Sequence, residues 1–109
     1  MSKMLICGLG AAFVALASSG SPALAQTAKA QEYTKLAAQY LPKSRSEQEM
    51  IQAYMKVPAR QRGAFKTRYP GVSKSIWDYA PYAVCFYASV AGGADVVEAG
   101  DECHDDWVN

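Results

Sequence analysis

A charge-free run of 16 residues, from Tyr79 to Ala94, constrains the fold of this chain more than any other feature. A helix that is apolar all round is normally enclosed by its neighbours. The run is also shorter than the roughly 20 apolar residues that span a bilayer. We therefore predict a buried central helix, with Asp78 as its N-cap and Gly92-Gly93 as its end.

Two stretches before this run have helical periodicity. The first lies between Ala28 and Leu41, where apolar residues recur three and four positions apart, at Tyr33, Leu36, Ala37, Tyr40 and Leu41. The second begins near Ser44, where two capping boxes are available, Ser46 with Glu49 or Ser44 with Glu47. Its predicted buried face consists of Met50, Ile51, Tyr54 and Met55.

Two further helices are predicted from cap and turn signals. Pro58 suits the first turn of a helix over 58–69, which the Pro70-Gly71 turn follows. Near the end of the chain, Asp95 with Glu98 forms another cap signal, Gly100 interrupts, and a last short helix covers 101–108. Only Val96-Val97 hints at extended structure. The fold class we predict is all-α, a small bundle of four or five short helices stapled by one disulfide.

The first 25 residues have the parts of a secretory signal peptide. Lys3 precedes an apolar run over 4–17, and the small residues of SSGSPALA stand before Gln26. We expect cleavage after Ala25, which leaves one small helical domain over 26–109 with no membrane span. The predicted location is therefore outside the cytoplasm, periplasmic or extracellular.

Export determines the expected state of the cysteines. Cys7 lies in the predicted signal peptide, so the mature chain keeps Cys85 and Cys103. In an oxidising compartment such a pair usually forms a disulfide. Closing a loop of about 19 residues is worth roughly 3 kcal/mol on the chain-entropy view.

Charge is segregated along the predicted mature chain. Residues 26–74 carry ten Lys and Arg against three Glu, whereas residues 75–109 carry seven Asp and Glu and neither Lys nor Arg. The two parts either face each other and neutralise, or leave a face free for a partner of opposite sign. The densest basic group contains Arg60, Arg62, Lys66 and Arg68.

The C-terminal GDECHDDW is the one stretch that suggests cation or haem chemistry. It contains the only histidine, His104, among carboxylates, but it lacks the ligand order of an EF-hand loop and the number of ligands that zinc takes. Covalent haem attachment would need a cysteine where Gly100 stands. We expect no metal, no cofactor and no catalytic residue here, and we read the stretch as a solvated acidic helix end.

With metal, cofactor and catalytic roles set aside, the sequence favours recognition of another molecule. Aromatic residues and arginine are the types that anchor protein interfaces, and Trp77, Tyr79 and Trp107 are the aromatics that we expect to be exposed. We predict an exported protein that is not an enzyme and binds another protein as an inhibitor, immunity or accessory factor, without nucleic acid. Two alternatives are a module that binds an anionic envelope polymer through its basic face, and a small carboxylate-based enzyme. A homodimer through the opposed charges is a further prediction.

Overall fold

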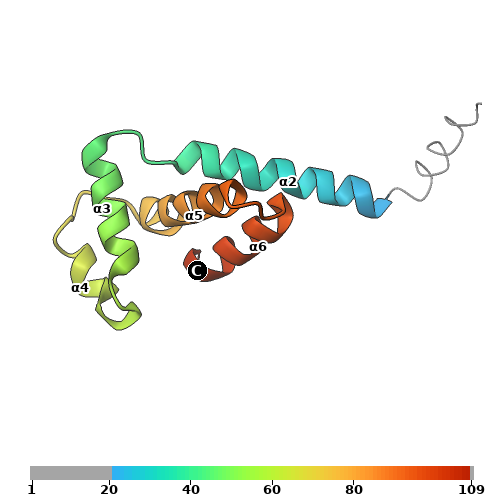
Figure 1. Ribbon diagram of the computed structural model, residues 1–109. Helices are drawn as coiled ribbons and strands as arrows, with labels where there is room; N and C mark the ends of the chain where they lie inside the picture. Colours follow the sequence, from blue (N-terminus) through green and yellow to red (C-terminus); the bar gives the residue numbers. More distant parts are fainter. Residues whose placement is uncertain (1–20, 109) are drawn as a thin grey trace, which may run out of the picture.

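Five α-helices and one short 3-10 helix make up residues 21–108, the part of the chain that the computed structural model describes (Figure 1). No strand occurs in that part, so the predicted all-α bundle is confirmed. In chain order the elements are α2 (Ser21–Tyr40), α3 (Arg45–Lys56), the 3-10 helix η1 (Ala59–Gln61), α4 (Arg62–Lys66), α5 (Lys74–Ala91) and α6 (Val96–Trp107).

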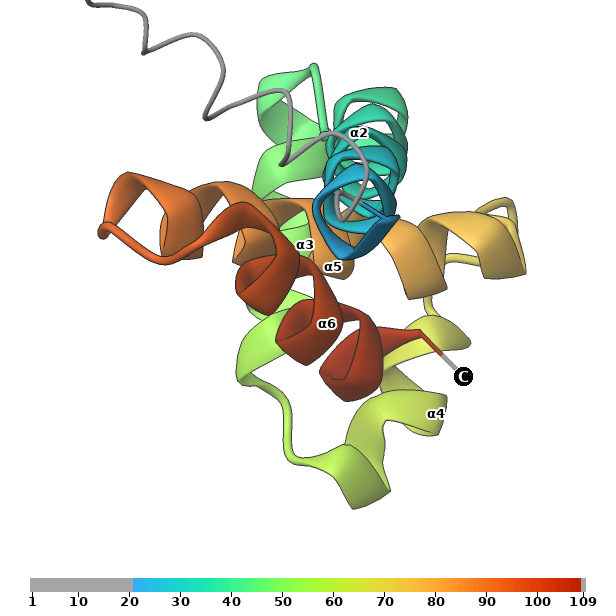
Figure 2. The ribbon, with the colours of Figure 1, turned by 90° about the vertical axis from the view of Figure 1, so that its right-hand side faces the viewer.

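The central position belongs to α5, as its lack of charge predicts. It packs against α2, α6 and α3, and Figure 2 shows α2 and α6 crossing it. Two apolar clusters result, both of which include residues of α5. The first joins α2, α5 and α6 through Ala37, Tyr82, Ala83, Phe86, Ala99 and Cys103. The second joins α3, α4 and α5 through Ile51, Tyr54, Phe65, Trp77 and Ala80.

The disulfide holds the first cluster together. Cys85 of α5 and Cys103 of α6 are bonded, as predicted, and Cys103 is only 1% exposed. The C-terminal helix is thereby fastened to the buried face of the central helix.

The predicted start of the central helix is wrong. Asp78 lies inside α5, where it accepts a hydrogen bond from Lys74 Nζ at 2.6 Å. The N-cap is Ser73, whose hydroxyl accepts from Ile76 N at 3.4 Å. Because Ser73 follows the turn at 70–71, the helix gains an additional turn that buries Trp77. The predicted end is correct, since Gly92 is the C-cap and Gly93 has a φ of 102°.

The last helix is longer than predicted, and Gly100 does not interrupt it. Asp95 is its N-cap and accepts from the backbone N–H groups of Val97 and Glu98 at 3.1 and 3.2 Å. Val96 and Val97 are therefore helical, not extended. Gly100 is buried against Tyr33 of α2, and a Cβ at this position would overlap the tyrosine ring.

The other helices differ from prediction mainly at their ends. α2 begins at Ser21 and ends before Leu41, which is 37% exposed and does not belong to the buried stripe. In α3 the Ser44 register is used, because the Ser44 hydroxyl accepts from Glu47 N at 3.1 Å. The helix expected over 58–69 is split into η1 and the five-residue α4.

Residues 1–20, which carry most of the predicted signal peptide, lie outside the described residues. Cleavage after Ala25, export and the single mature domain therefore stay predictions. Within 21–108, none of the helices combines the length and the apolar character needed to cross a bilayer.

Candidate partner-binding surface

The four predicted basic candidates lie on three successive pieces of backbone. Arg60 is on η1, Arg62 and Lys66 are on α4, and Arg68 follows α4. Arg62 and Lys66 share a face, because both cations lie about 6 Å from the ring centroid of Tyr54. The prediction that one helix carries all four is wrong, since α4 ends at Lys66.

Aromatic rings lie beneath three of these cations. The Arg62 guanidinium lies 4.4 Å from the ring centroid of Trp107, and that of Arg68 lies 5.4 Å from Phe65. A cation over a ring face is attracted by the ring quadrupole, most strongly with Trp. We call Arg60, Arg62, Lys66 and Arg68, with the rings of Tyr54, Phe65 and Trp107, the basic–aromatic surface.

The rings of this surface are part of a larger stacked group. Tyr54 and Trp77 have ring centroids 4.8 Å apart, and Phe65 and Tyr69 have centroids 5.4 Å apart. Burial raises the pKa of the Tyr54 hydroxyl, and the positive charge of Arg62 opposes that rise. The rings therefore form one continuous group beneath Arg62, Lys66 and Arg68.

The three aromatic residues predicted to be exposed differ in burial and in their neighbours. Trp77 is only 4% exposed, so its predicted exposure is wrong: it faces the second core cluster from the first turn of α5. Trp107 is half-buried beneath Arg62. Tyr79 is half-buried in another group of rings, 5.0 Å from Tyr40, and does not join the basic–aromatic surface.

Ion pairs neutralise little of this basic charge. Among residues 21–108 there are three ion pairs, and only Lys29–Asp101 and Lys74–Asp78 connect the basic and acidic parts of the chain. None of them involves the basic–aromatic surface. Arg62 Nε is buried and has no hydrogen-bond partner in the described part, so contact with the rings offsets its loss of water.

A shallow depression continues from this surface. It has a volume of about 390 Å³ and is lined by Lys66, Thr67, Tyr69, Pro70, Val72, Lys74 and Trp77. Two lysines and two aromatic residues therefore line it, and the ammonium group of Lys74 is paired with Asp78 at 2.6 Å. The sequence reasoning missed Tyr69 and Lys74, although their nearness to the basic segment and the 70–71 turn was a usable signal.

The acidic C-terminal stretch has structural partners. His104 is half-buried between the rings of Tyr33, Tyr79 and Tyr82, whose centroids lie 6.0 to 6.5 Å from its own. Asp101 accepts a hydrogen bond from the Tyr33 hydroxyl at 2.5 Å and pairs with Lys29 at 3.2 Å. These two contacts, the tyrosine first, lower the pKa of Asp101. In the described range no three His, Cys, Asp or Glu side chains converge as a cation site.

Comparison of the chain with models of protein families, with curated proteins and with solved structures finds no match.

Proposed function

We propose that this protein acts outside the cytoplasm by binding another protein through the basic–aromatic surface. One observation carries the proposal: three of the four cations lie over aromatic rings, and no carboxylate of the described chain pairs with any of the four. An acidic segment of a partner would supply the missing counter-charge. The partner relation would be that of an inhibitor, immunity or accessory protein.

Preorganisation is the physical reason to expect useful affinity. Binding usually requires that long side chains be ordered, at about 0.5–1.5 kcal/mol each. Here Arg62 and Arg68 already rest on Trp107 and Phe65. Their planar guanidinium groups can then meet a carboxylate through two parallel hydrogen bonds.

A second candidate is an anionic envelope polymer, favoured by the same unpaired cations. A flexible polyanion would bind mainly by charge, so its affinity would fall steeply as salt rises. A protein partner held also by aromatic contacts would lose less. A carboxylate-based enzyme has no supporting observation in residues 21–108.

The test is affinity capture from the native envelope, with quantification of what is retained. The variant is Arg60→Gln with Arg68→Gln, because both side chains are exposed and neither stacks on Trp107. The matched control is Lys35→Gln with Lys43→Gln, which removes two exposed cations elsewhere.

We expect one stoichiometric protein partner, bound about tenfold more weakly by the Arg60 and Arg68 variant and normally by the control. Retention of polysaccharide or lipid alone, released at moderate salt, would select the polymer. Equal binding by the variant and the wild type would refute the role of this surface.

A further inference from the structure

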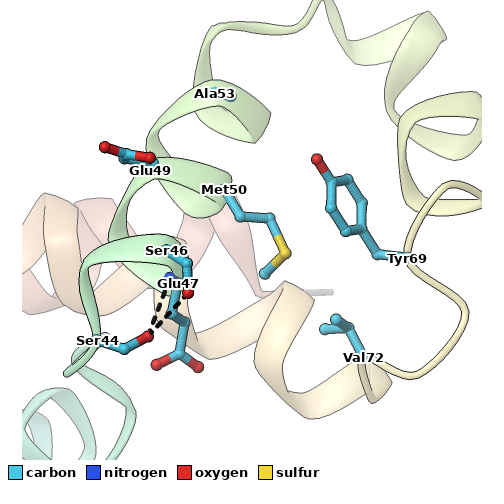
Figure 3. A pocket seen from close by; sticks show the side chains of 8 residues that line it. All are labelled: Ser44, Ser46, Glu47, Glu49, Met50, Ala53, Tyr69 and Val72. Atoms are coloured by element: carbon cyan, nitrogen blue, oxygen red, sulfur yellow. Dashed lines mark hydrogen bonds between the residues drawn. The ribbon is translucent and has the colours of Figure 1, made fainter.

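A second hollow is also lined by the segment that carries Tyr69. It has a volume of about 730 Å³ and lies between α3 and the residues before α5 (Figure 3). Tyr69 and Val72 line both this pocket and the depression beside the basic–aromatic surface. The pocket and the depression therefore share the wall that these two residues form.

One side of the pocket is lined by apolar and aromatic side chains. In Figure 3 the Met50 side chain and the Tyr69 ring face each other across the hollow, with Val72 beside them. The Tyr69 ring packs against two other rings, because its centroid lies 5.4 Å from that of Phe65 and 6.0 Å from that of Trp77. A flexible thioether opposite a fixed ring suits an unbranched aliphatic chain.

The rim of the pocket is acidic. Glu47 and Glu49 line it, and no Lys or Arg does. The only ion-pair partner of Glu49 in the described chain is Arg45, at 3.7 Å, and the two side chains are 71% and 91% exposed. Such an exposed pair is weak. Glu49 also lies beyond the first turn of α3, where the positive end of the helix dipole has little effect on a cation.

We propose that this pocket binds a lysine or arginine side chain of a partner protein. The aliphatic stem would lie between Met50 and Tyr69. In Figure 3 the Glu49 carboxylate is turned away from this gap, and because its side chain is 71% exposed it can rotate toward a cationic head at the rim. Glu47, which accepts a hydrogen bond from Lys43 N at 3.2 Å, is the second carboxylate of the rim. Long basic side chains commonly bury their stems while the charged end stays in water. The inference does not depend on the basic–aromatic surface, whose charge has the opposite sign.

The Tyr69 hydroxyl adds a polar group to the same wall. It makes no hydrogen bond to any residue of the described chain. A backbone carbonyl of an extended partner segment can accept its proton. A peptide is therefore a better fit than a free amine.

The experiment titrates the full protein with blocked pentapeptides, followed by NMR of the Met50 methyl group and the Tyr69 ring. The probe has one lysine between alanines, and the matched peptide has norleucine, which keeps the stem and lacks the charge. A third peptide has glutamate at that place. The protein variants are Glu49→Gln and, as a control on α2, the exposed Glu32→Gln.

We expect saturable shifts with the lysine peptide and affinity at least about threefold lower with norleucine. Glu49→Gln should weaken lysine binding by about threefold, the range of a partly exposed charge pair. Glu32→Gln should change nothing. The Arg60 and Arg68 variant should bind the lysine peptide normally, which separates this test from that of the proposed function.

Several results would overturn the inference. They are the absence of a saturable shift, equal binding of norleucine, binding of the glutamate peptide in the pocket, and unchanged affinity in Glu49→Gln. Self-association of the protein that disappears in Glu49→Gln would assign the pocket to a second copy of the chain instead.

Discussion

Replacing Gly100 by alanine should destabilise the protein, although alanine is the better helix former. In an open helical position this substitution gains about 1 kcal/mol. At Gly100, however, the new Cβ would overlap the ring of Tyr33. The ring must then move, because Gly100 lies on the buried face of α6, which the disulfide fastens to α5.

The expected size follows from the contacts that Tyr33 makes. Its hydroxyl donates to Asp101 at 2.5 Å, a hydrogen bond worth about 1 kcal/mol. Its ring packs 6.3 Å from both Tyr82 and His104, and such contacts contribute roughly 1 kcal/mol each. Loss of about 3 kcal/mol, less the gain of about 1, leaves a destabilisation of about 2 kcal/mol.

Urea unfolding followed by far-UV circular dichroism measures this difference, with an unchanged slope as the check on two-state behaviour. The matched control is Gly63→Ala in α4, where a Cβ meets nothing within 4 Å and should stabilise by up to about 1 kcal/mol. Tyr33→Ala combined with Gly100→Ala should be less unstable than the sum of the single variants. A Gly100→Ala protein as stable as the wild type would refute the reasoning.

Two further outcomes are expected. Replacing Cys85 and Cys103 by alanine should lower the free energy of unfolding by roughly 3 kcal/mol, and equal urea midpoints for the variant and the oxidised wild type would contradict this. Burial, followed by the hydrogen bond to Asp101, raises the pKa of Tyr33 from 10.0 to about 12. Because the folded-state pKa is the higher one, the stabilisation is complete below about pH 10 and is lost as the pH rises through 12. Tyr33→Phe should therefore lose less stability than the wild type between about pH 9 and about pH 12, and identical losses in urea unfolding would argue against it.

The parts of the fold that depend on local pattern were predictable. The stripe from Tyr33 to Tyr40 faces the first core cluster, and Ile51 and Tyr54 are buried on α3. The uncharged run forms the central helix, and the cysteine pair is bonded. In each case the residues that carry the signal are close together in the chain or are the only pair available.

The predictions were wrong at positions where the local sequence allows two structures. At these positions a contact with a residue distant in the chain decides between the two. Ser73 and Asp78 are both good N-caps, and the earlier one is used in a structure in which Trp77 packs against Tyr54. Gly100 has the sequence signal of a helix break, yet the close approach of Tyr33 requires a glycine within the helix. Neither contact is visible in a local stretch of sequence.

The candidate site was predictable in composition but not in arrangement. Arg62 and Lys66 stand on one face, as their spacing indicates. Stacking of Arg62 on Trp107 brings together residues from two helices that are far apart in the chain. The pocket beside Met50 is likewise formed by two separate segments, so no single sequence motif indicates it.

Trp107 is the only side chain that packs against both apolar clusters of the described structure. It therefore connects the α2, α5 and α6 part of the interior with the α3, α4 and α5 part. Loss of the Trp107 ring would therefore remove a contact that both clusters share. This ring also lies under the Arg62 guanidinium, so the residue that joins the two clusters also forms part of the basic–aromatic surface.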